Sequence, residues 1–118
     1  MIESTLYNYL KNDTAVSLAV AGEIYPVVAP SDRKTPFLVY QNIVGVDETS
    51  LQGDKYNEKT RFQIKIYSHS YGEVKEVLGV VKEALYSFGH FPHDLTTQDL
   101  YEKETKLFGQ LIDFKFNN

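Results

Sequence analysis

The 118-residue sequence contains no cysteine and no tryptophan, and it has one methionine. Without cysteine the chain cannot form disulfide bonds, build a thiolate metal site or use a thiol nucleophile. It also has no apolar run that approaches the ~18 to 20 residues of a transmembrane helix, and residues 1–10 show neither the basic start nor the apolar stretch of a signal peptide. These absences remove several enzyme classes and predict a chain that is made in the cytoplasm and has no membrane partner.

Positive charge is also scarce. Twelve Lys and Arg oppose sixteen Asp and Glu, for a formal net charge of −4. The basic residues are spread along the chain, whereas a protein that grips a nucleic acid normally concentrates them in a patch. Sequence-specific binding of nucleic acid is therefore not expected.

Apolar and aromatic residues are plentiful, at 42% and 14% of the chain. This composition is far from that of a disordered protein, and the length suits one domain of ~100 to 150 residues. A single domain that spans residues 1–118 and has an aromatic core is expected.

The first part of the sequence predicts a short helix pair. Between residues 1 and 11, Ile2, Leu6 and Leu10 recur at the helical period. A second helical turn at residues 15–20 would begin at Asp13 or Thr14 as N-cap and end at Gly22. Residues 22–30 contain two prolines and are interpreted as an extended connector or an edge strand.

The main helix is predicted after Ser70. This residue and Glu73 have the spacing of a capping box, and apolar residues then recur at steps of three or four from Val74 to Phe88. Gly89 would end the helix.

Four further segments have the residue pattern of strands. The clearest alternates apolar and polar residues from Thr60 to Tyr67. The others are residues 37–44, 95–101 and 105–116. The order of elements predicts an α+β fold: an antiparallel four-stranded sheet packed on one face by a long helix, with a short N-terminal helix pair.

Two groups of residues could form a metal site or a catalytic site, and each also has a purely structural interpretation. His90 and His93 have an H-x-x-H spacing beside Asp94, which could hold zinc, but they lie in a loop instead of one turn apart on a helix. His69 stands between two serines, yet neighbours in a strand point apart and no G-x-S-x-G turn is present. No catalytic residue, metal ligand or cofactor is therefore assigned.

Two sets of residues are candidates for contacts with partners. The loop at residues 45–58 is too polar to pack, lacks the spacing of a calcium loop and holds two isolated apolar residues. Its acidic residues are Asp47, Glu48, Asp54 and Glu58, and its apolar ones are Leu51 and Tyr56. If Ile64 faces the helix, the opposite face of the sheet presents Arg61, Gln63, Lys65, Leu107 and Leu111. Leucines outside the core suggest a partner, although scattered apolar residues on a surface are also ordinary.

Three strings of residues resemble a known family. They are GEIYPVVAP at residues 22–30, TPFLVYQ at 35–41 and RFQIKIYS at 61–68, the last followed by Tyr71 and a helix. In order and spacing, with the helix pair before them, they are similar to the tail completion, or tail-to-head joining, proteins of long-tailed bacteriophages and prophages. The resemblance covers roughly residues 1–85.

The resemblance implies a structural virion protein without catalysis. Such a protein has a fold similar to tail terminators, assembles as a hexameric ring that caps the head-proximal end of the tail tube, and joins it to the head. The implied partners are copies of itself, the tail tube protein and the head connector or neck protein, and the implied location is the host cytoplasm during assembly and then the virion tail. The partner residues would be those of the outer face with Leu51 and Tyr56, and the loop acids would face the lumen. The alternatives are a neck or head-closure protein, or a small hydrolase or ligand-binding domain that uses the histidine loop.

Overall fold

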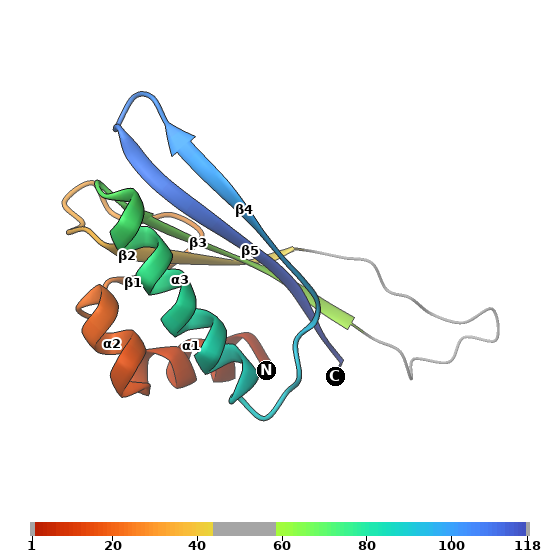
Figure 1. Ribbon diagram of the computed structural model, residues 1–118. Coiled ribbons are helices and arrows are strands. Elements are labelled where there is room, and N and C mark those ends of the chain that lie inside the picture. Colours follow the sequence, from red (N-terminus) through yellow and green to blue (C-terminus); the bar gives the residue numbers. More distant parts are fainter. Residues whose placement is uncertain (1, 44–58, 118) are drawn as a thin grey trace.

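The protein has two layers, a sheet and a set of helices that cover one of its faces (Figure 1). The computed structural model describes residues 2–43 and 59–117; the acidic loop residues with Leu51 and Tyr56 lie outside this range. In chain order the elements are α1 (Ile2–Asn12), α2 (Thr14–Val20), β1 (Ile24–Pro26), β2 (Phe37–Ile43), β3 (Lys59–Ser68), α3 (Tyr71–Tyr86), β4 (His93–Glu102) and β5 (Leu107–Asn117).

The sheet has five strands in the order β1-β2-β3-β5-β4, so the expectation of four strands was wrong. The additional strand is β1, which pairs in parallel with β2 and places Ile24 opposite Leu38. The other three pairings are antiparallel, as expected. A three-residue strand that ends at a proline is possible because an edge strand bonds on one side only. The same prolines made this segment resemble a connector in the sequence.

The N-terminal helix pair is confirmed, and its caps agree with the predicted ones. The Asp13 side chain accepts a hydrogen bond from the Val16 amide at 3.0 Å, which satisfies one of the free amides at the start of α2. At the other end Ala21 adopts the left-handed conformation, with φ of 51°, immediately before Gly22. The helix ends at Val20, as expected, and its C-cap is Ala21, one residue before the glycine that was expected to close it.

The cap of α3 forms partly as the capping-box spacing predicts. The Ser70 hydroxyl accepts from the Glu73 amide at 3.3 Å. The Glu73 carboxylate does not return to the Ser70 amide; it accepts from the Ser68 hydroxyl, and that hydroxyl in turn accepts from the Ser70 amide at 3.3 Å. Ser68 thus links the end of β3 to the start of α3.

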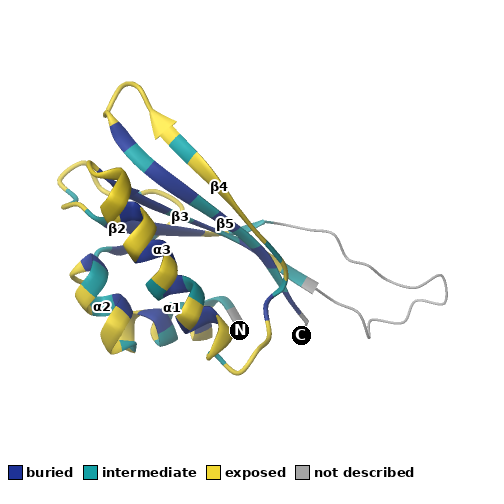
Figure 2. Cartoon of the chain, in the orientation of Figure 1, coloured by how far each residue is buried: buried dark blue, intermediate teal, exposed yellow. Residues whose placement is uncertain are grey.

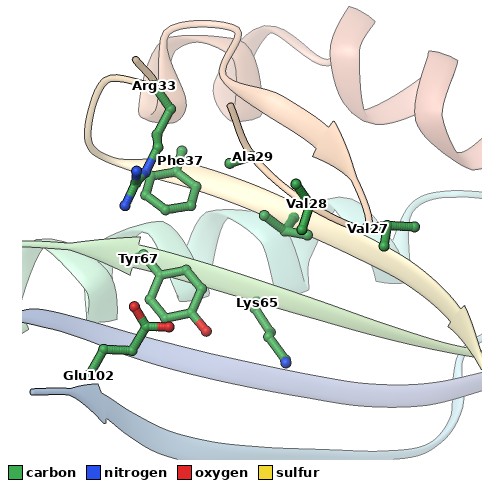
Figure 3. A pocket seen from close by; sticks show the side chains of 9 residues that line it. Val27, Val28, Ala29, Arg33, Phe37, Lys65, Tyr67 and Glu102 are labelled. Atoms are coloured by element: carbon green, nitrogen blue, oxygen red, sulfur yellow. The ribbon is translucent and has the colours of Figure 1, made fainter. Parts of the chain in front are cut away.

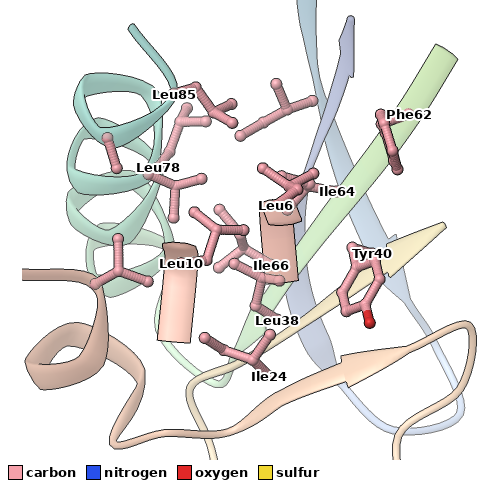
Figure 4. Packing of buried hydrophobic residues seen from close by; sticks show 14 of the residues in the cluster. Leu6, Leu10, Ile24, Leu38, Tyr40, Phe62, Ile64, Ile66, Leu78 and Leu85 are labelled. Carbon is pink, nitrogen blue, oxygen red and sulfur yellow. The ribbon is translucent and has the colours of Figure 1, made fainter. Parts of the chain in front are cut away.

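The main core lies between the helices and one face of the sheet (Figure 4). Leu6 and Leu10 of α1 pack there with β3 residues such as Ile64, and all three are fully buried. Burying each side chain of this size contributes about 1.5 to 3 kcal/mol. The sides of the helices and strands that face one another are buried, whereas β4 is exposed along most of its length (Figure 2).

Aromatic rings fill one end of this core. The Phe62 ring of β3 stacks on Phe114 of β5 at 5.9 Å between centroids and meets Phe116 edge-on at 5.9 Å. All three are fully buried. Since the two strands are neighbours, these contacts join their pairing to the packing of the core.

Replacing Phe114 with alanine should lower the free energy of unfolding by about 3 to 5 kcal/mol, because it removes a buried ring and leaves a cavity. Urea denaturation followed by far-UV circular dichroism would measure this. Phe91→Ala is the control, because the Phe91 side chain is 64% exposed and its loss should change stability by no more than about 0.5 kcal/mol. Equal losses in the two variants would contradict this account of the core.

Candidate assembly surface

The face of the sheet that points away from the helices carries a second, smaller apolar cluster. Phe37 and Val39 of β2, Tyr67 of β3 and Leu107 of β5 are all buried there. Partly buried residues pack against them: Tyr25, Ala29 and Leu100. Leu107 is therefore on the predicted face but is only 2% exposed, contrary to the expectation of a solvent-facing leucine. The segment after β1 supplies part of the cover.

Tyr67 lies at the centre of this cluster. Its ring lies across Gly109 of β5, where an added Cβ would come within 2.8 Å of a ring carbon, so a glycine is needed for the ring to lie flat on the sheet. The Phe37 ring contacts it at 5.4 Å. Burial, with a smaller contribution from Glu102, raises the pKa of the Tyr67 phenol. The ring is thus a fixed apolar wall.

An open pocket adjoins the cluster (Figure 3). Its volume is about 310 Å³, near the lower end of ~300 to 1,000 Å³ for small-molecule sites. The residues that line it are Val27, Val28, Ala29, Arg33, Phe37, Val39, Lys65, Tyr67 and Glu102. Val27 and Val28 are 63% and 73% exposed, which is unusual for apolar side chains beside a pocket. The Arg33 guanidinium lies 5.0 Å from the centre of the Phe37 ring.

The other end of the outer face is polar. Arg61 makes two hydrogen bonds to the Asp113 carboxylate, at 3.0 and 2.6 Å, and the Gln63 amide donates a third at 3.0 Å. Mainly through the Arg61 hydrogen bonds, the pKa of Asp113 is held below its ordinary value, although partial burial opposes this. Arg61 and Gln63 thus lie on the predicted outer face of the sheet. Both donate hydrogen bonds to the Asp113 carboxylate of the same chain.

Lys65 and Leu111 complete the predicted set. They lie opposite one another on β3 and β5, on the same outer face, and both are partly buried. Sequence reasoning therefore found the residues of the two long strands. It did not single out the pocket-lining residues of the segment after β1, namely Val27, Val28 and Arg33. The one local signal was a pair of adjacent valines between two prolines.

The histidine loop does not form a metal site among the residues that the structure describes. The His90 ring packs against Phe88 at 5.3 Å, and the His93 ring lies 5.5 Å from Phe91. Asp94 points towards Lys115, at 3.9 Å. Within residues 2–43 and 59–117 no group of three or more histidine or acidic side chains is placed to hold a metal ion.

The serines beside His69 have structural roles. Ser68 is 1% exposed, and its hydroxyl is bonded within the α3 cap. Ser70 is the N-cap itself. A nucleophile needs an accessible oxygen, so the geometry does not support Ser68 in that role. Of the helices in the described ranges, none combines the length and apolar character that crossing a membrane requires.

A further polar cluster, which sequence reasoning did not anticipate, fastens β4 to α3. The Asp99 carboxylate of β4 accepts hydrogen bonds from Lys75 at 3.1 Å, from the Tyr71 hydroxyl at 3.2 Å and from the Gln110 amide. These bonds, the one from Gln110 first, lower the pKa of Asp99. These hydrogen bonds hold the exposed edge strand β4 against helix α3.

These features define a small α+β module whose outer sheet face has an open pocket of apolar, aromatic and charged residues at one end and a bonded polar network at the other. The family model for tail completion protein gp17 matches residues 4–116. The chain therefore belongs to the tail completion protein gp17 family, and it is a structural protein of phage-type tails.

A solved structure has the same fold. A chain of the virion of a native gene transfer agent particle matches with a TM-score of 0.70 and 14% sequence identity, over 98% of this chain and 92% of the other. No curated protein matches this sequence.

The hydrogen bonds to the Asp113 carboxylate predict that the stability of the fold falls at acidic pH. Because the folded pKa is below the unfolded one, this carboxylate stabilises the fold fully above pH ~4, and the contribution is lost as the pH falls below that value. Asp113→Asn should cost about 1 kcal/mol at pH 7 and should flatten the loss of stability between about pH 5 and 2. Urea denaturation across this range would measure both effects. Asp32→Asn, in an exposed loop, controls for the loss of one charge; a slope for Asp113→Asn equal to that of the parent would contradict the prediction.

Proposed function

We propose that this protein caps the head-proximal end of the tail tube as a ring and joins the tube to the head connector. The observation that carries this proposal is the match to the tail completion family over nearly the whole chain, residues 4–116. On this proposal its partners are copies of itself, most simply six, together with the tail tube protein and the connector or neck protein. It would be present in the host cytoplasm during assembly and then in the virion tail.

Two structural features support a role in assembly. The outer face of the sheet carries an open pocket with aromatic walls, charged lining residues and exposed valines at its rim, a mixture that suits contact with another protein. The fold is shared with a chain from a virion particle, that of the gene transfer agent. The proposed contact residues are those of the outer face, with Leu51 and Tyr56 from the loop outside the described range.

Deleting the gene would test the proposal and separate it from the neck alternative. A cap limits the growth of the tube, so its loss should give tail tubes of abnormal and variable length that do not join heads. Loss of a neck protein should instead leave tails of normal length beside unattached heads. Electron microscopy of the lysate would distinguish these outcomes, and normal virions from the deletion strain would refute both roles.

The acidic loop gives a second expectation for the ring. We propose that Asp47, Glu48, Asp54 and Glu58 face its lumen, where negative charge suppresses contacts with the phosphates of passing DNA. Changing all four to lysine should leave tail assembly intact and should slow DNA ejection, which the release of DNA from purified particles would measure over time.

The control for this variant reverses charge elsewhere. Asp32, Glu76 and Glu104 are exposed on the described surface, and changing them to lysine alters the net charge in the same direction. Ejection from these particles should be normal. Normal ejection from the loop variant, or slowing in both, would refute a lumen position for the loop acids.

A further inference from the structure

Two surface features with exposed apolar residues lie towards opposite ends of α3, and they differ in shape. The outer pocket lies near the start of this helix, where the segment after β1 folds over the sheet (Figures 1 and 3). The connection from α3 to β4, which contains Phe91, lies beyond the far end of the helix (Figure 1). The first feature is concave, and the second presents exposed aromatic rings.

The aromatic projection consists of Tyr86, at the end of α3, and Phe91, in the connection between α3 and β4. Phe91 is 64% exposed and Tyr86 is 50% exposed, and their rings lie 5.9 Å apart. The His93 ring also contacts Phe91, at 5.5 Å between ring centres, and Pro92 between them is buried. A supported aromatic ring can enter a partner at little conformational cost, and such rings are frequent among the residues that dominate binding energy.

The pocket has the size and lining for such a ring. Phe37 and Tyr67 form fixed aromatic walls, and Val28 at the rim is exposed and free to cover an inserted side chain. At about 310 Å³ the pocket has room for one aromatic side chain, but not for a helix. Burial of a phenyl ring would also cover apolar surface that is now in contact with water.

Charge favours the same pairing. Arg33 and Lys65 line the pocket with Glu102, so this lining has a net positive charge in a chain whose formal charge is −4. Beside the projection, exposed Glu83 lies one helical turn before Tyr86, and the Asp94 side chain is 71% exposed although it lies 3.9 Å from Lys115 of the same chain. A second copy of the chain therefore brings carboxylates to the cations at the pocket.

We propose that Phe91 of one copy inserts into the outer pocket of the next copy. The proposal rests on the proposed ring, and it assigns a role to the loop that contains His90 and His93. The two surfaces of the contact are different parts of the chain, so the contact is head-to-tail. Such a contact gives a ring when its rotation closes, whereas a contact between identical surfaces would stop at a dimer.

Photo-crosslinking tests the contact and its direction. Benzoylphenylalanine incorporated at position 91 keeps an aromatic group at the projection and captures whatever lies against it. The sample is irradiated both as concentrated purified protein and as assembled tails, and the products are mapped by mass spectrometry. We expect a ladder of covalent oligomers beyond the dimer, with crosslinks to the 27–39 segment of a second copy. The same probe at position 18 is the control, because Leu18 is 80% exposed on α2, away from both surfaces.

Two variants test whether the contact depends on the pocket and on the Phe91 ring. Val28→Asp places a charge at the rim of the pocket and should reduce the crosslink from position 91 at least tenfold. Phe91→Ser should reduce incorporation into tails by a similar factor, while its circular dichroism spectrum and urea midpoint stay close to those of the parent because the residue is exposed.

The outcomes separate this contact from the proposed function. A crosslink that stops at the dimer, that maps outside the residues lining the pocket (those within 27–39, with Lys65, Tyr67 and Glu102), or that Val28→Asp leaves unchanged would overturn the contact, even if an immunoblot finds the protein in tails. Absence of the protein from tails would overturn the proposed function, and the purified sample would still decide whether the two surfaces meet.

Discussion

The pairing of β3 with β5 supports the rest of the molecule. These two long strands bond along ten residue pairs and lie at the middle of the sheet, so both apolar clusters depend on their register. On one face the pairing places Phe62 beside Phe114 under the helices; on the other it places Tyr67 across Gly109. A shift by one residue would exchange the two faces and would send the aromatic core towards solvent.

The sequence predicted those parts of the fold that depend on local pattern. Alternation defined β3, helical periodicity defined α1 and α3, and both caps were placed at Asp13 and Ser70, because each of these signals lies within a few neighbouring residues. The fifth strand was left open as a connector or an edge strand and was not counted in the sheet, because its pairing is with residues 14 positions away and three residues carry no periodicity of their own. What a short strand pairs with is decided by tertiary contacts.

Local sequence pattern also predicted only part of the outer face of the sheet. Alternation assigned Arg61, Gln63 and Lys65 to the outer face correctly, since the side-chain period of a strand is two. It could not show that Leu107 is covered, because the cover comes from Leu100 of the next strand and from the segment after β1. A strand pattern gives the direction of a side chain, whereas its exposure depends on which distant segment folds over it. Both the pocket and the polar network arise from such distant neighbours.

The short strand β1 also affects how copies of this protein can associate. A sheet edge with free amides and carbonyls invites further strands and can lead to uncontrolled fibrous growth. Here that edge is three residues long and ends at Pro26, which has no amide hydrogen to donate. Added strands would find few partners, so backbone pairing through this edge is disfavoured.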